Sequence, residues 1–318
     1  MGIFTWLAVV SIFLCLTLDR AIGQIVFPSP TAEELTRAQL ILEEYDNNST
    51  KLTRFAVLAD VNFVQENPKD SAYSSDDIYL MVKDSANGLK RFDSVASSYS
   101  ASLGVSRQIV HTVLLGEKTV EWFVEGRSAN SRTLREESDV DKNDTALRDS
   151  GKMEMLDPFY LAISGYNAFI KRRTVTRDRG FPRLQDYKIS RVEDDLRGTV
   201  VELEVSEKYG VYYQVFFSRE VNLPVESRLV NGHDRKNELS IVKSKWGNFG
   251  NHPVPEMVVA HQLLGSKPSL TKRTWSVEFT WKNLPKKGAK TMFQSDEGTL
   301  TVPTSSIVEY IRSGEPSK

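Results

Sequence analysis

Residues 54–63, RFAVLADVNF, alternate between two kinds of side chain, and this alternation decides the predicted fold. One set is apolar: Phe55, Val57, Ala59, Val61 and Phe63. The other set contains Arg54, Asp60 and Asn62, together with Ala56 and Leu58. Successive side chains of a β-strand point to opposite faces, so this period of two predicts a strand with one clearly apolar face.

The same period recurs through the second half of the chain. Trp275, Val277, Phe279 and Trp281 form one face, and polar residues alternate with them. Further strands are predicted between residues 187 and 261 at short spacing, without intervening helices. Asn87-Gly88 and Asn231-Gly232 are the strongest hairpin signals. Strands in this arrangement are typical of an antiparallel meander with one buried face.

Two segments carry helical patterns. Thr31, followed three residues later by Glu34, predicts a capping box. An apolar stripe then predicts an amphipathic helix that lies on the sheet: Leu35, Ala38, Ile41, Leu42 and Tyr45. Residues 153–166, near Asp157-Pro158, predict a short apolar helix. Two roles are open for it, a helix that packs in the core and a movable cover over a cavity.

The predicted fold class is α+β and mainly antiparallel β. It is a curved, unclosed half-barrel meander covered by one N-terminal amphipathic helix and one short mid-chain helix. We expect a single domain over residues 24–312, with a long polar loop inserted at 125–152 and a polar tail at 313–318. The segment from Pro303 onward is expected to be loosely held.

Residues 1–23 predict export. An uncharged run ends at Asp19-Arg20 and is followed by small residues, which is typical of a secretory signal peptide cleaved near Gly23. A retained anchor is the alternative. The single cysteine, Cys15, lies inside this run, so the mature chain forms no disulfide, and a periplasmic or secreted protein of a bacterial envelope is expected. A net charge of −1 argues against a nucleic-acid partner.

Motifs for catalysis, metals and cofactors give no candidate residue. The four histidines lack the spacing of a metal site, and no nucleophile elbow or phosphate-binding loop occurs. We therefore predict no catalytic residue, no metal and no cofactor. A hydrolase with a dispersed site stays open, because separation in space cannot be read from one sequence.

Aromatic side chains recur at strand positions. They either fill a packed core or line an apolar cavity that holds an acyl chain. The predicted lining residues are Phe55, Val57, Val61, Phe63, Trp122 and Trp275. Trp122 is placed inward because Val120 and Val124, two residues to either side, are also apolar.

The order of these features resembles the LolA-like superfamily of periplasmic lipoprotein carriers. The matching stretches are Phe63-Val64-Gln65, residues 78–83, residues 118–123 and residues 292–303. The resemblance implies an unclosed β-barrel that wraps an apolar cavity under helices. Carriers of this family have Arg-Pro after the lysine of the second strand, and that arginine latches the lid. Here Asp84-Ser85 follows Lys83, so the latch is absent at the matching position.

Three functional hypotheses follow. The first is an exported, non-enzymatic protein that binds a lipid or a lipoprotein acyl chain. The second is a structural or protein-interaction module of the cell envelope, with a packed core and a protein partner. The third is the hydrolase with a dispersed site.

Overall fold

The computed structural model describes residues 28–67, 70–100, 105–115, 119–125, 132–137, 157–164, 183–194, 196–206, 210–232, 235, 237–264, 271–296 and 299–313. The expected signal segment lies outside these residues, and its cleavage stays a prediction. The single-domain assignment also stays a prediction. Within the described residues, every helix is too short or too polar to span a bilayer.

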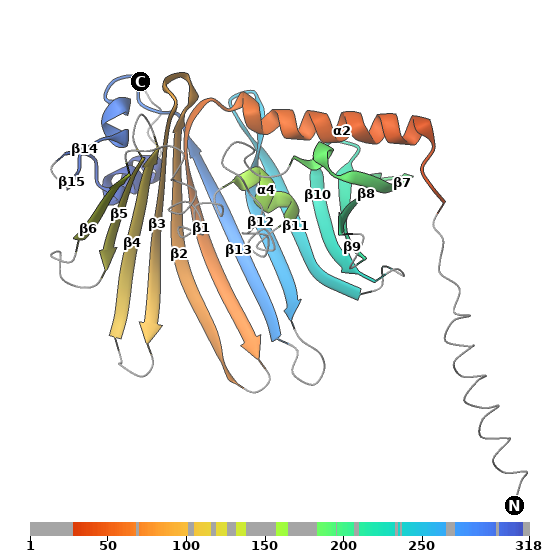
Figure 1. The fold of residues 1–318 in the computed structure, drawn as a ribbon, viewed down its shortest axis with the longest axis horizontal. Coiled ribbons are helices and arrows are strands. Elements are labelled where there is room, and N and C mark those ends of the chain that lie inside the picture. Colours follow the sequence, from red (N-terminus) through yellow and green to blue (C-terminus); the bar gives the residue numbers. More distant parts are fainter. Residues whose placement is uncertain are drawn as a thin grey trace, which may run out of the picture.

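Thirteen strands form one sheet (Figure 1). They are β1 (Arg54–Asn67), β2 (Asp70–Asp84), β3 (Leu89–Ser100), β4 (Val105–Leu115), β5 (Thr119–Glu125), β6 (Arg132–Glu137), β7 (Lys188–Asp194), β8 (Gly198–Ser206), β9 (Val211–Ser218), β10 (Pro224–Asn231), β11 (Asn237–Phe249), β12 (His252–Leu264) and β13 (Thr271–Lys282). Their order is β6-β5-β4-β3-β2-β1-β13-β12-β11-β10-β9-β8-β7.

The sheet consists of two antiparallel meanders that meet at its centre. β1 to β6 run outward in sequence order, whereas β7 to β13 run from the far edge back to the middle, where β13 pairs with β1. In the described chain, β6 and β7 stand at opposite edges, so the sheet is not closed. The predicted fold class, an unclosed antiparallel half-barrel covered by two helices, is confirmed.

Both hairpin signals mark turns between paired strands. Gly88 connects β2 to β3 with a φ of 66°, and Gly232 follows β10 with a φ of 92°. These values lie in the left-handed region, which glycine adopts without steric penalty. The sequence interpretation nevertheless missed β3 itself, because its serine-rich run lacks the apolar alternation that identifies a strand.

One face of the sheet, here called the helix-side face, contains Phe55, Val57 and Val61 and is covered by helices. α2 (Ala32–Lys51) begins with the predicted capping box, in which the Thr31 and Glu34 side chains each accept the other residue's backbone N–H. Ala38, Leu42 and Tyr45 of its stripe are buried, while Leu35 at its start is 36% exposed. α4 (Pro158–Ser164) lies over β10, β11 and β12 (Figure 1).

The opposite face, here called the C-terminal face, is covered as well. η6 (Ala289–Phe293) and α5 (Thr304–Arg312) pack against it, and the short strands β14 (Ser295–Asp296) and β15 (Thr299–Leu300) form a hairpin between them. Ile307 and Ile311 of α5 are 0% and 1% exposed, in a core with Leu58 and Leu80. The expectation that the segment from Pro303 is loosely held is therefore wrong for residues 303–313, and the rest of the segment lies outside the described residues. The spacing of these two isoleucines by four residues is the signal of an amphipathic helix that was overlooked.

The expected polar loop at residues 125–152 contains a strand. β6 pairs with β5: Thr119 lies opposite Glu137 at one end of the pairing, and Val124 lies opposite Arg132 at the other. The loop expectation is therefore wrong for residues 132–137. The sequence of β6, RTLREE, is highly charged, which is characteristic of sheet edges because charge discourages further pairing. Most of the remaining residues of the expected loop lie outside the described ones.

Candidate functional site on the helix-side face of the sheet

Five of the six predicted lining residues share the helix-side face at the centre of the sheet. β1 and β13 bring them together, because Phe63 pairs with Trp275, and Val57 with Trp281. Phe55, Val57 and Val61 are 3%, 0% and 5% exposed. Phe63 and Trp275 are only partly buried, and their ring centroids lie 5.1 Å apart. The structure therefore divides the predicted lining into a buried part and a partly exposed aromatic pair.

α4 occupies the buried part. All seven of its residues, from Pro158 to Ser164, are buried. Its side chains join α2 and the sheet in the helix-side core, which includes Leu42, Phe159, Leu161, Val215, Val258 and Val277. Of the two roles left open for this segment, the described contacts favour a helix that packs in the core.

Polar contacts fix both ends of α4. The last carbonyls of a helix have no partner within it. Here Ser244 Oγ donates to the carbonyl of Ala162 at 2.9 Å, and Ser227 Oγ donates to that of Ile163. At the other end, the Asp157 carboxylate accepts the backbone N–H groups of Phe159 and Tyr160 at 3.0 and 3.1 Å. The sheet therefore caps the C-terminal end of α4 through its two serines, and Asp157 caps the N-terminal end.

An aromatic cluster surrounds Tyr45 of α2. Its ring lies edge-on to those of Phe159, Phe217 and Trp246, with centroid distances of 6.2, 6.2 and 6.0 Å. The Tyr45 hydroxyl donates to the carbonyl of Phe159, so α2 and α4 are joined directly. Edge-to-face pairs of this kind add to the stability that ring burial provides.

The partly exposed rings of Phe63 and Trp275 are the centre of a group of residues that we call the outer site. The outer site also includes Val61, and Gln65 and Arg273 lie at its edge. Arg273 Nε donates to Gln65 Oε1 at 2.8 Å, and residue pairing places both on the same face as the rings. The outer site lies toward the β1–β2 turn. The contacts of α4 with the sheet are instead on β10, β11 and β12. Apolar rings beside amide and guanidinium groups are suited to an amphipathic ligand.

The register contradicts the placement of Trp122. Directly paired residues on neighbouring strands share a face. Pairing aligns Trp122 with Thr112, Thr112 with Asp93, Asp93 with Leu80, and Leu80 with Leu58. This row belongs to the C-terminal face, whereas Phe123 aligns with the row of Tyr79 and Ala59. The inference failed because both faces of the sheet are apolar at its centre, so an apolar row does not identify the helix side.

Two charged groups near α4 have shifted pKa values. Burial raises the pKa of the Asp157 carboxyl, and the backbone N–H groups at the start of α4 offset part of this rise. Burial and the neighbouring Lys90 ammonium lower the pKa of Lys83. The Lys83 ammonium also lies 5.8 Å from the centroid of the Phe55 ring. Both groups lie at the packed end of the helix-side face. The Asp157 carboxylate has a structural role there, because it caps the N-terminus of α4.

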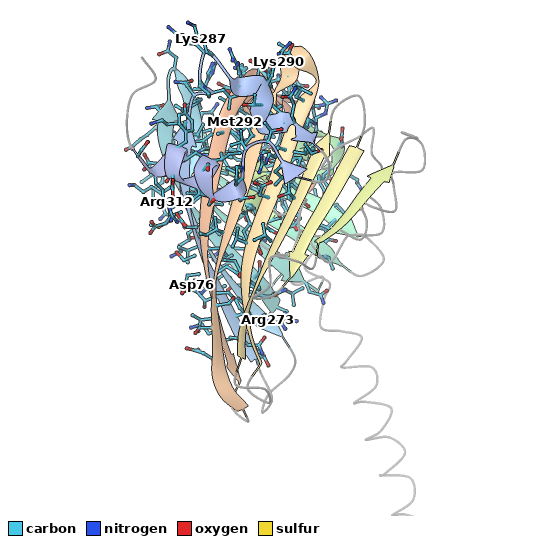
Figure 2. All side chains as sticks on the ribbon, turned by 90° about the vertical axis from the view of Figure 1, so that its left-hand side faces the viewer. Asp76, Arg273, Lys287, Lys290, Met292 and Arg312 are labelled. Carbon is cyan, nitrogen blue, oxygen red and sulfur yellow. The ribbon has the colours of Figure 1, made fainter. Side chains whose placement is uncertain are left out.

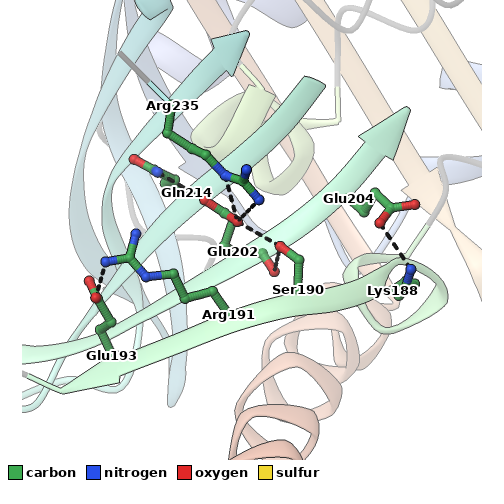
Figure 3. Close-up of polar contacts among 8 residues, drawn as sticks. All are labelled: Lys188, Ser190, Arg191, Glu193, Glu202, Glu204, Gln214 and Arg235. Atoms are coloured by element: carbon green, nitrogen blue, oxygen red, sulfur yellow. Dashed lines mark hydrogen bonds and ion pairs between the residues drawn. The ribbon is translucent and has the colours of Figure 1, made fainter. Parts of the chain in front are cut away.

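A second buried carboxylate lies on the opposite face, between β7, β8 and β9 (Figure 3). Glu202 is 1% exposed and accepts from Ser190 Oγ at 2.7 Å and from Gln214 Nε2 at 3.0 Å. Arg235 completes the group with an ion pair at 3.2 Å, and its guanidinium lies 4.0 Å from the centroid of the Tyr212 ring. Both carboxylate oxygens are engaged, so this cluster holds the turn after β10 to β8.

Metal-binding chemistry has no candidate here either. Among the residues that the structure describes, no group of three His, Cys, Asp or Glu side chains is arranged to hold an ion. His261 shares a hydrogen bond with Thr274 Oγ1 at 3.1 Å across β12 and β13. The absence of a cofactor and of catalysis stays a prediction.

No protein-family model and no curated protein matches the chain. Solved structures that match it include a LolA superfamily protein from Nitrosomonas europaea, with 14% identity and a TM-score of 0.38 over 81% of this chain and 98% of that one. A putative outer membrane lipoprotein-sorting protein domain from Vibrio parahaemolyticus has 9% identity and a TM-score of 0.39 over 79% and 92%. A DUF1329 family protein from Desulfovibrio piger has 8% identity and a TM-score of 0.41 over 81% and 96%.

The first of these structures carries the superfamily name that the sequence motifs suggested, and the second is a lipoprotein-sorting domain. The predicted resemblance to a divergent LolA-like protein is confirmed as a resemblance. With TM-scores below 0.5 and identities below 15%, we take neither a ligand nor a partner from these proteins.

Proposed function

We propose that the chain is an exported, non-enzymatic binding protein whose outer site receives the acyl chain of a lipid or lipoprotein. The observation that carries this proposal is the Phe63–Trp275 pair. Its two rings lie tilted to each other on the helix-side face, with centroids 5.1 Å apart, and keep part of their surface exposed, while the neighbouring Val61 is 5% exposed. An acyl chain laid across these rings would extend the apolar core that α2 and α4 begin.

The driving force would be the burial of apolar surface. Each methylene removed from water contributes about 0.8 kcal/mol, so ten methylenes contribute about 8 kcal/mol. The translational and rotational freedom lost on association opposes binding by about 4–15 kcal/mol, and the ordering of the chain adds to this cost. Affinity would then depend on how much of the acyl chain is covered, and Gln65 and Arg273 would contact its polar end.

A titration with the fluorescent fatty acid cis-parinaric acid tests the proposal. Phe63→Ala and Trp275→Ala are each expected to weaken binding at least about tenfold, which corresponds to about 1.4 kcal/mol. Val64→Ala is the matched control, because Val64 neighbours Phe63 on β1 but belongs to the opposite face. It is expected to leave the affinity unchanged. Equal affinity in all three variants would exclude the outer site.

The second candidate is an interaction module with a packed core and no ligand. The burial of every residue of α4 favours it, because that helix fills the space beneath α2. The two candidates differ in the same titration. A module without a ligand gives no saturable fluorescence change, and a pull-down with it returns an envelope protein that binds the Phe63→Ala variant equally well.

A further inference from the structure

One end of the molecule carries a cluster of basic side chains, here called the basic end. Its members come from the last turn of α2, the start of β1, the end of β13, the segment that leads into η6, and η6 itself: Lys51, Arg54, Lys282, Lys286, Lys287 and Lys290. All are exposed except Lys282, which is partly buried. Figure 2 shows Lys287 and Lys290 at one end of the molecule, with Arg273 toward the other end.

Backbone and side-chain contacts hold these elements together. Arg54 donates from Nη2 to the carbonyl of Pro285 at 3.2 Å, which ties the start of β1 to the lysine-bearing segment. Lys282 is paired with Ala56 across β13 and β1, and its ammonium lies 5.4 Å from the centroid of the Tyr310 ring. The cluster is therefore assembled by the fold from segments more than two hundred residues apart.

Little negative charge offsets this cluster. Among the described residues, the carboxylate of Asp84 lies 3.7 Å from Arg54 Nε, and its side chain is only 4% exposed. α5 adds the exposed Glu309. Lys286, Lys287 and Lys290 make no ion pair with any carboxylate in the part of the chain that the structure describes. With a net charge of −1 for the whole chain, this end is a local concentration of positive charge.

We infer that the basic end docks the protein on an anionic phospholipid surface. Lysine makes up five of the six residues, and lysine is depleted at protein interfaces, where aromatic residues and arginine dominate. Clusters of four to eight basic residues are instead typical of surfaces attracted to anionic lipids, at about 1 kcal/mol for each residue near the membrane. The inference rests on the proposed function only in that a protein with lipid cargo must meet a membrane.

Sedimentation with vesicles of phosphatidylcholine, with and without phosphatidylglycerol, tests this inference. The protein as isolated from the cell envelope is expected to bind the phosphatidylglycerol vesicles and to be released at 1 M salt, where the Debye length falls to about 3 Å. The double variant Lys286→Glu, Lys287→Glu is expected to bind at least about 20-fold more weakly, which follows from about fivefold for each lysine.

The matched control is Lys243→Glu, Lys272→Glu, which changes the net charge equally at two exposed positions of β11 and β13 outside the basic end. It is expected to bind as the unmodified protein does. Equal binding by both double variants, or equal binding to vesicles without phosphatidylglycerol, would overturn the inference. Retention on immobilised poly-glutamate without vesicle binding would overturn it in favour of an acidic protein partner. Titration of the same variants with cis-parinaric acid measures binding at the outer site independently, so that failure of this inference can be distinguished from failure of the proposed function.

Discussion

Replacement of Arg91 by methionine is expected to lower the free energy of unfolding by about 3–5 kcal/mol. Arg91 of β3 is 0% exposed and forms a bidentate pair with Asp93, which is 1% exposed. Its Nη1 also donates to the carbonyls of Met292 and Val302 at 2.8 and 2.7 Å. Methionine would leave the buried Asp93 carboxylate without its cation. The carbonyls of Met292 and Val302, in the C-terminal segment that covers this face of the sheet, would lose their donor. Urea unfolding followed by circular dichroism measures the change.

Two further variants serve as controls for this prediction. Arg312→Met removes an ion pair with Asp60 between side chains that are 50% and 42% exposed, and is expected to change stability by no more than about 1 kcal/mol. The double variant Arg91→Met, Asp93→Leu removes both charges and is expected to recover part of the loss. An Arg91→Met protein as stable as Arg312→Met would show that the cover does not depend on this contact.

Replacement of Ile307 by alanine is expected to lower the free energy of unfolding by about 2–5 kcal/mol. Ile307 is 0% exposed and lies between α5 and the C-terminal face, in one core with Ala56, Leu58 and Leu80. Removing its branched side chain leaves a cavity that close-packed neighbours fill only in part.

A graded pair of variants tests that explanation. Ile307→Val removes one methylene and is expected to lower the free energy of unfolding by about 0.5–1.5 kcal/mol, measured by urea unfolding in the same way. Ser305→Ala, at an exposed position of the same helix, is expected to change it by less than about 0.5 kcal/mol. Equal stability of Ile307→Ala and Ser305→Ala would mean that α5 does not form part of the folded core.

The sequence predicted those features that depend on local pattern. The capping box at Thr31, the alternation in residues 54–63 and the face of Trp275 and Phe279 each arise from neighbours within a few residues. The meander follows from such strands at short spacing. Five of the six predicted lining residues therefore share one face, and their pairing across β1 and β13 is what brings Phe63 to Trp275.

Features that depend on contacts between distant segments could not be predicted in this way. Nothing near Trp122 shows that the C-terminal segment covers the other face, so its apolar row was assigned to the helix side. Arg91 and Asp93 were missed for the same reason, since charged residues on a strand are normally taken as solvent-facing. Their partners, Met292 and Val302, are about two hundred residues away.

The position of Arg91 also bears on the missing arginine latch. In the carriers that the sequence resembles, the latch belongs to the lid over the cavity. Arg91 shares a row with Val82 and lies on the C-terminal face, where it holds the cover formed by η6 and α5. The cover of the helix-side face is held instead by Tyr45, Ser227 and Ser244 through the carbonyls of α4.

If the outer site holds an acyl chain, mass spectrometry of lipids extracted from the purified protein will detect that chain. Protein isolated from the cell envelope under mild conditions is expected to contain a lipid at near-stoichiometric amount, and the Phe63→Ala, Trp275→Ala double variant is expected to contain much less. Protein without lipid in both preparations, together with a structure in which side chains fill the outer site, would contradict the account.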